Sequence, residues 1–257
     1  MKRLLFITMA FAFLIPFTSF AQDERLDEYS FETAPIQEEE SPYFALGLGY
    51  TGSLQFPKLD LINTTIKDRF GLDKFNSVVW YNSVEGFTSL VFIPNMRLGF
   101  LGSGGGIKSQ KKDTVTGFTK TVEFETGLTG IALDYSFVPF KNFAVTAGSE
   151  LGWGELRLLA YQTDGDARWT DDMTPSTDAN NYYKRGSRSI LYARPRINAE
   201  FALTSVILLR LGAGYTYAFG SPTWEFNNLT ALKGVPKEIN FNGPSLQIGL
   251  FFGLFNY

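Results

Sequence analysis

The charged residues with the most regular spacing lie in the stretch YARPRINAEF, residues 192–201. Arg194, Arg196 and Glu200 occupy every second position or a multiple of it, and mostly apolar residues lie between them. Successive side chains leave a β-strand on opposite faces, so this alternation predicts a strand with one charged and one apolar face. Arginine and carboxylate side chains on a shared face can pair strongly, because the planar guanidinium satisfies several carboxylate oxygens at once.

The same alternation, extended over the other predicted strands, places six arginines and six acidic residues on one inward-facing surface. The predicted set is Arg97, Glu123, Glu125, Asp134, Glu150, Glu155, Arg157, Arg188, Arg194, Arg196, Glu200 and Arg210. An unpaired ion in a confined interior costs several kcal/mol, so we predict a hydrogen-bonded ionic network. Such a network either plugs the interior or lines a narrow path whose wall charges select ions or solutes.

The chain contains no histidine and no cysteine. This excludes Ser-His-Asp hydrolysis, histidine metal sites, disulfides and a lipoprotein anchor. Two glycine-rich stretches, GLGYTG at 47–52 and GSGGGIKSQKK at 102–112, lack the strand-to-helix context or the glycine before lysine that nucleotide-binding loops need. We therefore expect no catalytic residues, cofactor, metal or nucleic-acid partner. A histidine-free membrane enzyme is a third alternative, in which Glu123 and Glu125 are paired acids without an adjacent nucleophile.

Four aspartates group in one polar segment, at Asp164, Asp166, Asp171 and Asp172. Their carboxylates are of the kind that binds calcium, but the spacing of an EF-hand is not present. We therefore interpret this segment as a solvated outer loop, with a calcium site as the alternative.

The N-terminal region divides into two segments before the predicted fold begins. Residues 1–21 have Lys2 and Arg3, an apolar run and a small-residue cleavage site, which is typical of a secretory signal cleaved after Ala21. Residues 22–42 are acidic, and their composition predicts a disordered tail, with a periplasmic docking segment as the alternative. The remainder, 43–257, has 20 basic and 18 acidic residues and is nearly neutral.

The body of the chain is rich in Phe (25), Tyr (12) and Gly (25), and its alternating runs predict eight β-strands. The predicted ranges are 43–54, 77–93, 96–108, 119–138, 143–162, 188–203, 206–220 and 243–257. Tight connections with turn residues, such as Pro94–Asn95 and Thr204–Ser205, alternate with long polar ones. This pattern is typical of an all-β, closed antiparallel up-and-down transmembrane β-barrel.

The facing pattern predicts bulky apolar residues outside and small or charged residues inside, since eight strands enclose only a narrow interior. Breaks in the alternation near Gly130 and Gly154 predict β-bulges. Pro195 cannot donate a ladder hydrogen bond, so we expect a bulge or a local break there. The second strand does not divide into two clear faces.

One short amphipathic helix is expected in the first long loop, between Pro57 and Gly71. Leu59, Ile62, Ile66 and Phe70 recur three or four residues apart, and proline and glycine suit the two helix ends. The helix either packs on the barrel rim or acts as a lid or gate.

The last strand carries the most specific motif, a polar residue, a glycine and two apolar residues at fixed spacing: Gln247, Gly249, Phe252 and Leu254. In this motif the chain resembles outer-membrane β-barrel proteins, whose terminal strand carries a signal for the insertion machinery. In size it is similar to the small eight-stranded barrels typified by the transmembrane domain of outer-membrane protein A. The resemblance implies the cell outer membrane as location, with outer-membrane lipid and the insertion machinery as partners.

We therefore predict a non-enzymatic outer-membrane barrel with a plugged, charge-paired lumen and a structural or surface-interaction role. Loops 163–187 and 221–242 would form its contact surface, and the residues identify no particular extracellular partner. The alternative is a narrow channel or a transporter of small or apolar molecules, gated by the helix after Pro57.

Overall fold

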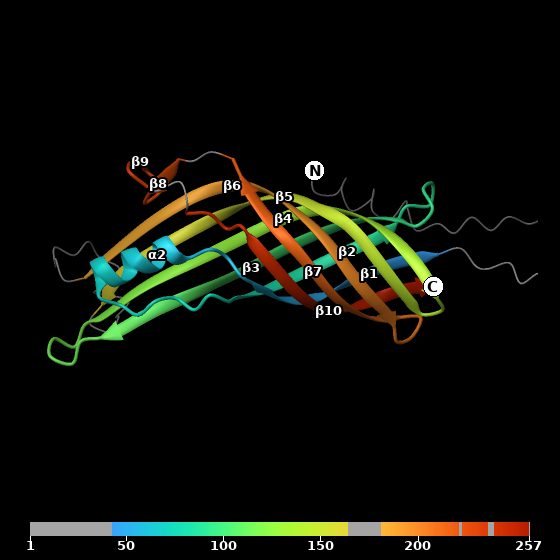
Figure 1. Ribbon diagram of the computed structural model, residues 1–257, viewed down its shortest axis with the longest axis horizontal. Helices are drawn as coiled ribbons and strands as arrows, with labels where there is room; N and C mark the ends of the chain where they lie inside the picture. The colour runs from blue at the N-terminus through green and yellow to red at the C-terminus, as the bar shows by residue number, and fades with distance from the viewer. Residues whose placement is uncertain (1–42, 164–180, 221–222, 236–238, 257) are drawn as a thin grey trace, which may run out of the picture. The chain divides into compact units, whose positions relative to one another are not determined.

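A closed ring of eight antiparallel strands is the main element of the computed structural model, which describes residues 43–163, 181–220, 223–235 and 239–256 (Figure 1). The ring strands are β1 (Phe44–Gln55), β2 (Val79–Ser89), β3 (Met96–Lys112), β4 (Thr119–Phe140), β5 (Phe143–Thr163), β6 (Tyr182–Ala202), β7 (Ile207–Phe219) and β10 (Gly243–Asn256). Each pairs with the next ring strand, and β10 pairs with β1 to close the ring. The predicted eight-stranded up-and-down barrel is confirmed. The predicted signal, the acidic tail and the four-aspartate segment lie outside the described residues.

Two short strands lie outside the ring, and sequence analysis missed them. β8 (Trp224–Phe226) and β9 (Thr230–Leu232) form a hairpin, and β8 pairs with the edge of β6. Asn227 and Asn228 in its turn both have positive φ, 50° and 57°. Asparagine tolerates this left-handed conformation better than most residues, which explains why asparagines occupy both of these turn positions.

The connections alternate between the two ends of the ring as predicted, but the turn expected at Pro94–Asn95 is longer, because β2 ends at Ser89 and not at residue 93. Residues 90–95, 141–142 and 203–206 are the short turns, and they lie at the same end as the start of β1 and the end of β10 (Figure 1). Asn95 and Asn142 adopt positive φ in two of these turns. In the third, the hydroxyl of Thr204 accepts hydrogen bonds from the backbone N–H groups of Val206 and Ile207. The long connections are at the other end.

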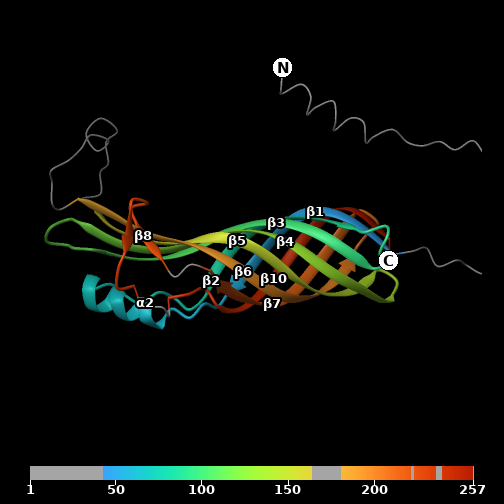
Figure 2. The same cartoon turned by 90° about the horizontal axis from the view of Figure 1, so that it is seen from above.

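Four neighbouring ring strands are longer than the others and form an extension at the long-loop end (Figure 2). β3 to β6 have 17 to 22 residues, whereas β1, β2, β7 and β10 have 11 to 14. A helix packs on the inner face of this extension: α2 (Asp60–Thr65) continues as the π-helix η2 (Ile66–Phe70) and ends at Gly71, whose φ is 65°. The predicted helix between Pro57 and Gly71 is confirmed. No described helix is long and apolar enough to cross a membrane.

The helix and the extension share an apolar core, which we call the upper cluster. Its buried members are Leu59, Ile62, Ile66, Leu72, Phe75, Val79, Tyr81, Val122, Phe124, Leu128, Leu156, Ala160, Ile190, Tyr192, Trp224, Ile239 and Phe241. Ile62 and Ile66 are almost completely buried in it. A smaller apolar core, the lower cluster, fills the ring near the short turns and consists of Ala45, Phe87, Ala202, Leu208, Phe251 and Phe255.

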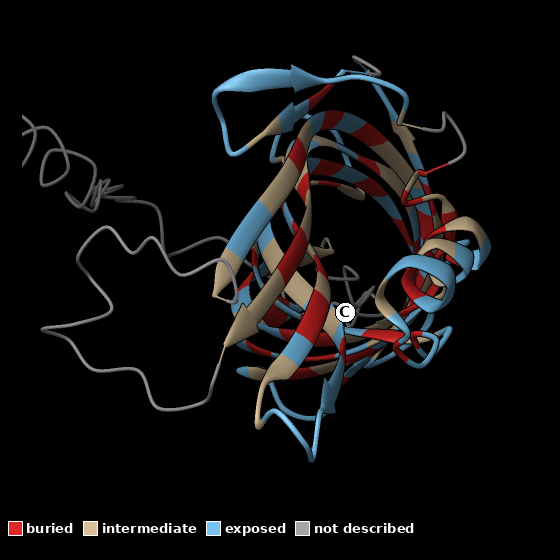
Figure 3. Cartoon of the chain, turned by 90° about the vertical axis from the view of Figure 1, so that its left-hand side faces the viewer, coloured by how far each residue is buried: buried red, intermediate tan, exposed pale blue. Residues whose placement is uncertain are grey.

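The outer face of the ring is apolar and has two aromatic belts. Buried and exposed residues alternate along the strands (Figure 3). The exposed aromatic residues of the belt towards the long loops are Tyr50, Trp80, Trp153, Tyr217 and Phe219, and those of the belt towards the short turns are Tyr135, Phe137, Phe140 and Phe201. Since the interior positions hold the charged residues, the bulky apolar face points outward, as the volume argument predicted.

The predicted bulges at Gly130 and Gly154 are wrong. β4 and β5 pair without interruption from Thr119 opposite Thr163 to Phe137 opposite Val145, and the register shifts only between Phe137 and Phe140. The apparent phase slip has another cause. Above the outer apolar band the inner face of β4 becomes apolar against the helix, and its outer face becomes polar.

Pro195 produces a local break but no bulge. On one side it lies opposite Ser149 in the continuous ladder of β5 and β6. On the other side the ladder of β6 and β7 lacks the pairs of Arg194 and Pro195, and resumes at Arg196 opposite Gly214 in the same register. The missing backbone N–H of proline therefore interrupts pairing without adding a residue.

Candidate functional site

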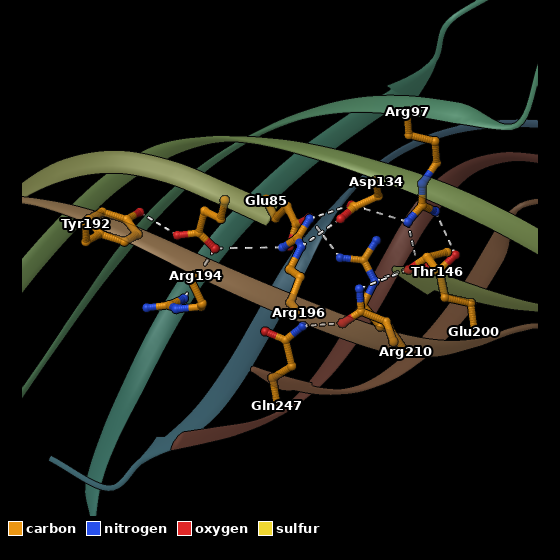
Figure 4. A network of polar contacts seen from close by, with 12 residues as sticks. Glu85, Arg97, Asp134, Thr146, Tyr192, Arg194, Arg196, Glu200, Arg210 and Gln247 are labelled. Carbon is orange, nitrogen blue, oxygen red and sulfur yellow. Dashed lines mark hydrogen bonds and ion pairs between the residues drawn. The ribbon is translucent and has the colours of Figure 1, made fainter. Parts of the chain in front are cut away.

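Eight charged side chains meet inside the ring, four arginines and four acids, and we call them the interior ion cluster (Figure 4). They are Glu85, Arg97, Asp134, Glu150, Arg194, Arg196, Glu200 and Arg210. They come from six successive ring strands, β2 to β7. Every second side chain of a strand points inward, and the antiparallel register brings these eight residues to similar heights in the ring.

Glu200 is bound by two arginines on one side of the cluster. Arg97 donates to it through both terminal nitrogens, at 2.7 and 3.0 Å. Arg210 donates from Nε at 2.8 Å. The guanidinium of Arg210 also lies 2.8 Å from Glu85, so it connects two carboxylates.

Arg196 connects the other carboxylates. It donates to both oxygens of Asp134, at 3.1 and 2.7 Å, and to Glu85 at 2.8 Å. Glu150 accepts from Arg194 at 3.3 Å and from the hydroxyl of Tyr192. Arg194 also donates from Nε to the hydroxyl of Thr216 at 3.0 Å, which fixes the orientation of its guanidinium.

The cluster is almost completely shielded from solvent. Seven of its side chains are at most 4% exposed, and Arg194 is 11% exposed. Charges in such a position cost several kcal/mol unless they are paired. The equal numbers of positive and negative groups and their short contacts meet this requirement.

Aromatic rings of the lower cluster pack against two of the arginines. Arg210 lies between the rings of Phe87 and Phe251, with its central carbon 4.8 and 4.2 Å from the ring centroids. Arg97 lies 4.5 Å above Phe87. Nη2 of Arg210 has no hydrogen-bond partner within the described part of the chain. The ring faces attract the cation and partly replace that missing hydrogen bond.

The structure places seven of the twelve predicted residues in the interior ion cluster: Arg97, Asp134, Glu150, Arg194, Arg196, Glu200 and Arg210. Arg188 also points inward, but at the level of the upper cluster, where it donates to the backbone oxygen of Ile239 at 3.3 Å. The ion cluster therefore lies between two apolar layers, the upper and the lower cluster.

The inward prediction is wrong for Glu123, Glu125, Glu155 and Arg157, which lie on the outer face of the extension. There they form an outer ion row together with Arg185. Arg157 is 4.0 Å from Glu125 and 2.7 Å from Glu155, and Arg185 is 2.6 Å from Glu155. Glu123 accepts a hydrogen bond from Tyr161 at 3.0 Å. The error follows from the bulges assumed at Gly130 and Gly154, because a one-residue shift exchanges the two faces of a strand.

Sequence reasoning missed Glu85 and two neutral members of the interior, Thr146 and Gln247. Glu85 shares the inward face of β2 with Tyr81 and Phe87, and these aromatic residues hid the polar-inside pattern of that strand. The neutral groups form a chain: Gln247 donates to Asn198 at 2.6 Å, and Asn198 donates to Thr146 at 3.0 Å. The pairing of β2 with β1 and β3 is what places Glu85 inward.

The four residues of the terminal motif lie on both faces of β10. Gln247 points inward, and Gly249 leaves space for the ring of Phe251. Phe252 and Leu254 are exposed on the outer apolar face. The structure thus assigns each a position in the barrel, and their role as an insertion signal stays a prediction.

The chain has structural similarity to known proteins at low sequence identity. No family model and no curated protein matches the chain. Solved structures that it resembles include Ail of Yersinia pestis (11% identity, 82% of this chain and 98% of that chain, TM-score 0.37). Another is a major outer membrane protein of Thermus thermophilus (13% identity, 81% of this chain and 98% of that chain, TM-score 0.41). A third is the outer membrane protease OmpT of Escherichia coli (12% identity, 82% of this chain and 93% of that chain, TM-score 0.37). Sequence identities of 11–13% to these proteins assign the chain to no family.

Proposed function

We propose that this protein is a non-enzymatic outer-membrane β-barrel whose lumen is plugged and which acts as a structural or surface-interaction protein. The height of the outer apolar band supports the membrane location. Glu125 and Phe137 are twelve residues apart on β4, about 40 Å along the strand and about 30 Å along the barrel axis at a tilt of about 40°. This equals the thickness of a hydrocarbon core, about 30 Å.

The burial of the interior ion cluster carries the proposal of a plugged lumen. Its arginines and carboxylates occupy the cross-section between the two apolar clusters and pair with one another instead of facing a water-filled path. A conducting pore would instead require wall charges that remain accessible to ions.

The long-loop end supports a role in surface contacts. The proposed contact surface comprises loops 163–187 and 221–242, of which residues 163, 181–187, 223–235 and 239–242 are described. The hairpin of β8 and β9 exposes Leu229 and Leu232 there. The helix α2 buries Ile62 and Ile66 in the upper cluster, which favours a fixed cover over a gate.

The outer acids do not support an enzyme. Glu123 and Glu125 interact with Tyr161 and Arg157, and no nucleophile with an activating base accompanies them in the described residues. Within the same residues, no cluster of acids could hold a metal ion. We further propose that the exposed outer face of β10 engages the outer-membrane insertion machinery during assembly.

Planar-bilayer recording of the refolded protein tests the plugged lumen. We expect no steady conductance steps, while a heat-modifiable gel shift and protease resistance verify that the barrel has inserted. Steady steps that change in Arg194→Ala or Arg196→Ala would instead establish a narrow channel through the cluster. Turnover of lipid or peptide substrates by the inserted protein would overturn the non-enzymatic proposal.

A further inference from the structure

A groove interrupts the bulky outer face of the ring across β1 to β5. It consists of two adjoining hollows of about 410 and 630 Å³, which share Val84, Gly102 and Thr129 as lining residues. Its floor is low because Gly86, Gly102, Gly127 and Thr129 face outward there. Leu48, Phe100 and Trp153 rise beside it. We call this region the outer groove.

The outer groove becomes polar towards the long-loop end. Asn82 lines it there and accepts hydrogen bonds from the hydroxyl of Tyr50 and the indole N–H of Trp80. Two residues beyond Gly127 on β4 is Glu125, opposite Arg157 on β5. The lining of the groove on β4 therefore ends at Gly127, and the outer ion row begins two residues beyond it.

The ion pair of the outer ion row that lies nearest the groove, Arg157 with Glu125, is long and exposed to solvent. Arg157 and Glu125 are 4.0 Å apart, and their side chains are 43% and 41% exposed. Glu155 is held more tightly, between Arg157 and Arg185. A charge of each sign is thus available just beyond the polar end of the groove.

The distance along β4 from Ile131, which lines the groove, to Glu125 matches one leaflet of a bilayer. Ile131 and Glu125 are six residues apart on β4. This corresponds to about 20 Å along the strand and about 15 Å along the axis of a barrel whose strands tilt by about 40°. Half of a hydrocarbon core of about 30 Å is also about 15 Å, so the Arg157 and Glu125 pair lies at headgroup level.

We propose that the outer groove binds one phospholipid whose headgroup carries both a phosphate and an ammonium group, as in phosphatidylethanolamine. An acyl chain would lie on Gly102 and Thr129, the phosphate would contact Arg157 and the ammonium Glu125. The inference rests on the proposed membrane location. A second copy of the chain fits less well, because a two-fold interface must be self-complementary and the groove needs a ridge as its partner.

Native mass spectrometry of protein refolded into phosphatidylethanolamine-containing vesicles and extracted in mild detergent tests the proposal. The variant Gly102→Leu fills the groove without disturbing the barrel, since a Cβ at Gly102 meets no atom within 4 Å. Ala147→Leu, at an exposed position of the outer face away from the groove, is the matched control. We expect one retained phosphatidylethanolamine in the parent and in the control, and at least tenfold less in Gly102→Leu.

The headgroup contacts have their own test. In vesicles that also contain phosphatidylglycerol, the parent should prefer phosphatidylethanolamine, and Glu125→Gln should lose this preference because the ammonium partner is removed. The proposal would be overturned if Gly102→Leu retained as much phosphatidylethanolamine as the parent, or if the parent showed no headgroup preference. A dimer of the parent that Gly102→Leu dissociates would also overturn it. A protein that inserts normally but retains no lipid refutes the lipid site alone, whereas failure to insert refutes the proposed function.

Discussion

Removing Arg97 from the interior ion cluster should cost far more stability than removing an arginine from the outer ion row. Arg97 is completely buried, binds both oxygens of Glu200 and lies 3.6 Å from Asp134. In Arg97→Met the interior ion cluster keeps four acids but only three arginines. Breaking a buried pair by removing one partner costs about 3–5 kcal/mol. We expect a loss of this size in the free energy of unfolding.

The matched control is Arg157→Met in the outer ion row, where the side chain is 43% exposed. Exposed ion pairs contribute about 0–1 kcal/mol, so this variant should remain close to the parent. Urea unfolding in lipid vesicles, followed by tryptophan fluorescence, measures both variants under the same conditions.

A double-mutant cycle separates the pair from its surroundings. Glu200→Leu alone leaves Arg97 and Arg210 with one carboxylate fewer, and Arg97→Met with Glu200→Leu restores equal numbers of charges. Groups in one network couple by about 0.5–3 kcal/mol, so the double variant should lose less stability than the sum of the single variants. An Arg97→Met variant no less stable than Arg157→Met would show that water reaches the cluster, and would refute the plugged lumen.

Further predictions concern ring closure, the helix and a turn. Gly253→Ala should reduce refolding, since a Cβ there would overlap a backbone carbonyl of β1, whereas Gly127→Ala meets no atom and should fold normally in a gel-shift assay. Ile66→Ala should lower the free energy of unfolding by about 2–5 kcal/mol, because it leaves a cavity under the helix. The backbone N–H of Val115 donates to Asp113, in the turn after β3, and lowers the pKa of its carboxyl. NMR titration should find this pKa below that of a free aspartate, so the turn loses this stabilisation as the pH falls through it, and an unshifted value would contradict the hydrogen bond.

The strands, the short turns and the helix follow from local sequence. Alternation of period two selects extended backbone whatever surrounds it, and Asn95 and Asn142 tolerate the positive φ of tight turns. The helix between Pro57 and Gly71 follows in the same way from its three- and four-residue spacing. These signals depend on a residue and its near neighbours, so they can be read without knowledge of the fold.

The environment of each face depends on the tertiary structure. On β4 a charged residue can face outward above the apolar band, at the level of Glu125. Within the band, at the level of Ile131, the outward residue is apolar. The sequence shows the alternation of the faces but not the height at which the surroundings change from lipid to water or to the covering helix. For the same reason only the closed ring revealed that Glu85 completes the interior charges, because its partners Arg196 and Arg210 lie on β6 and β7.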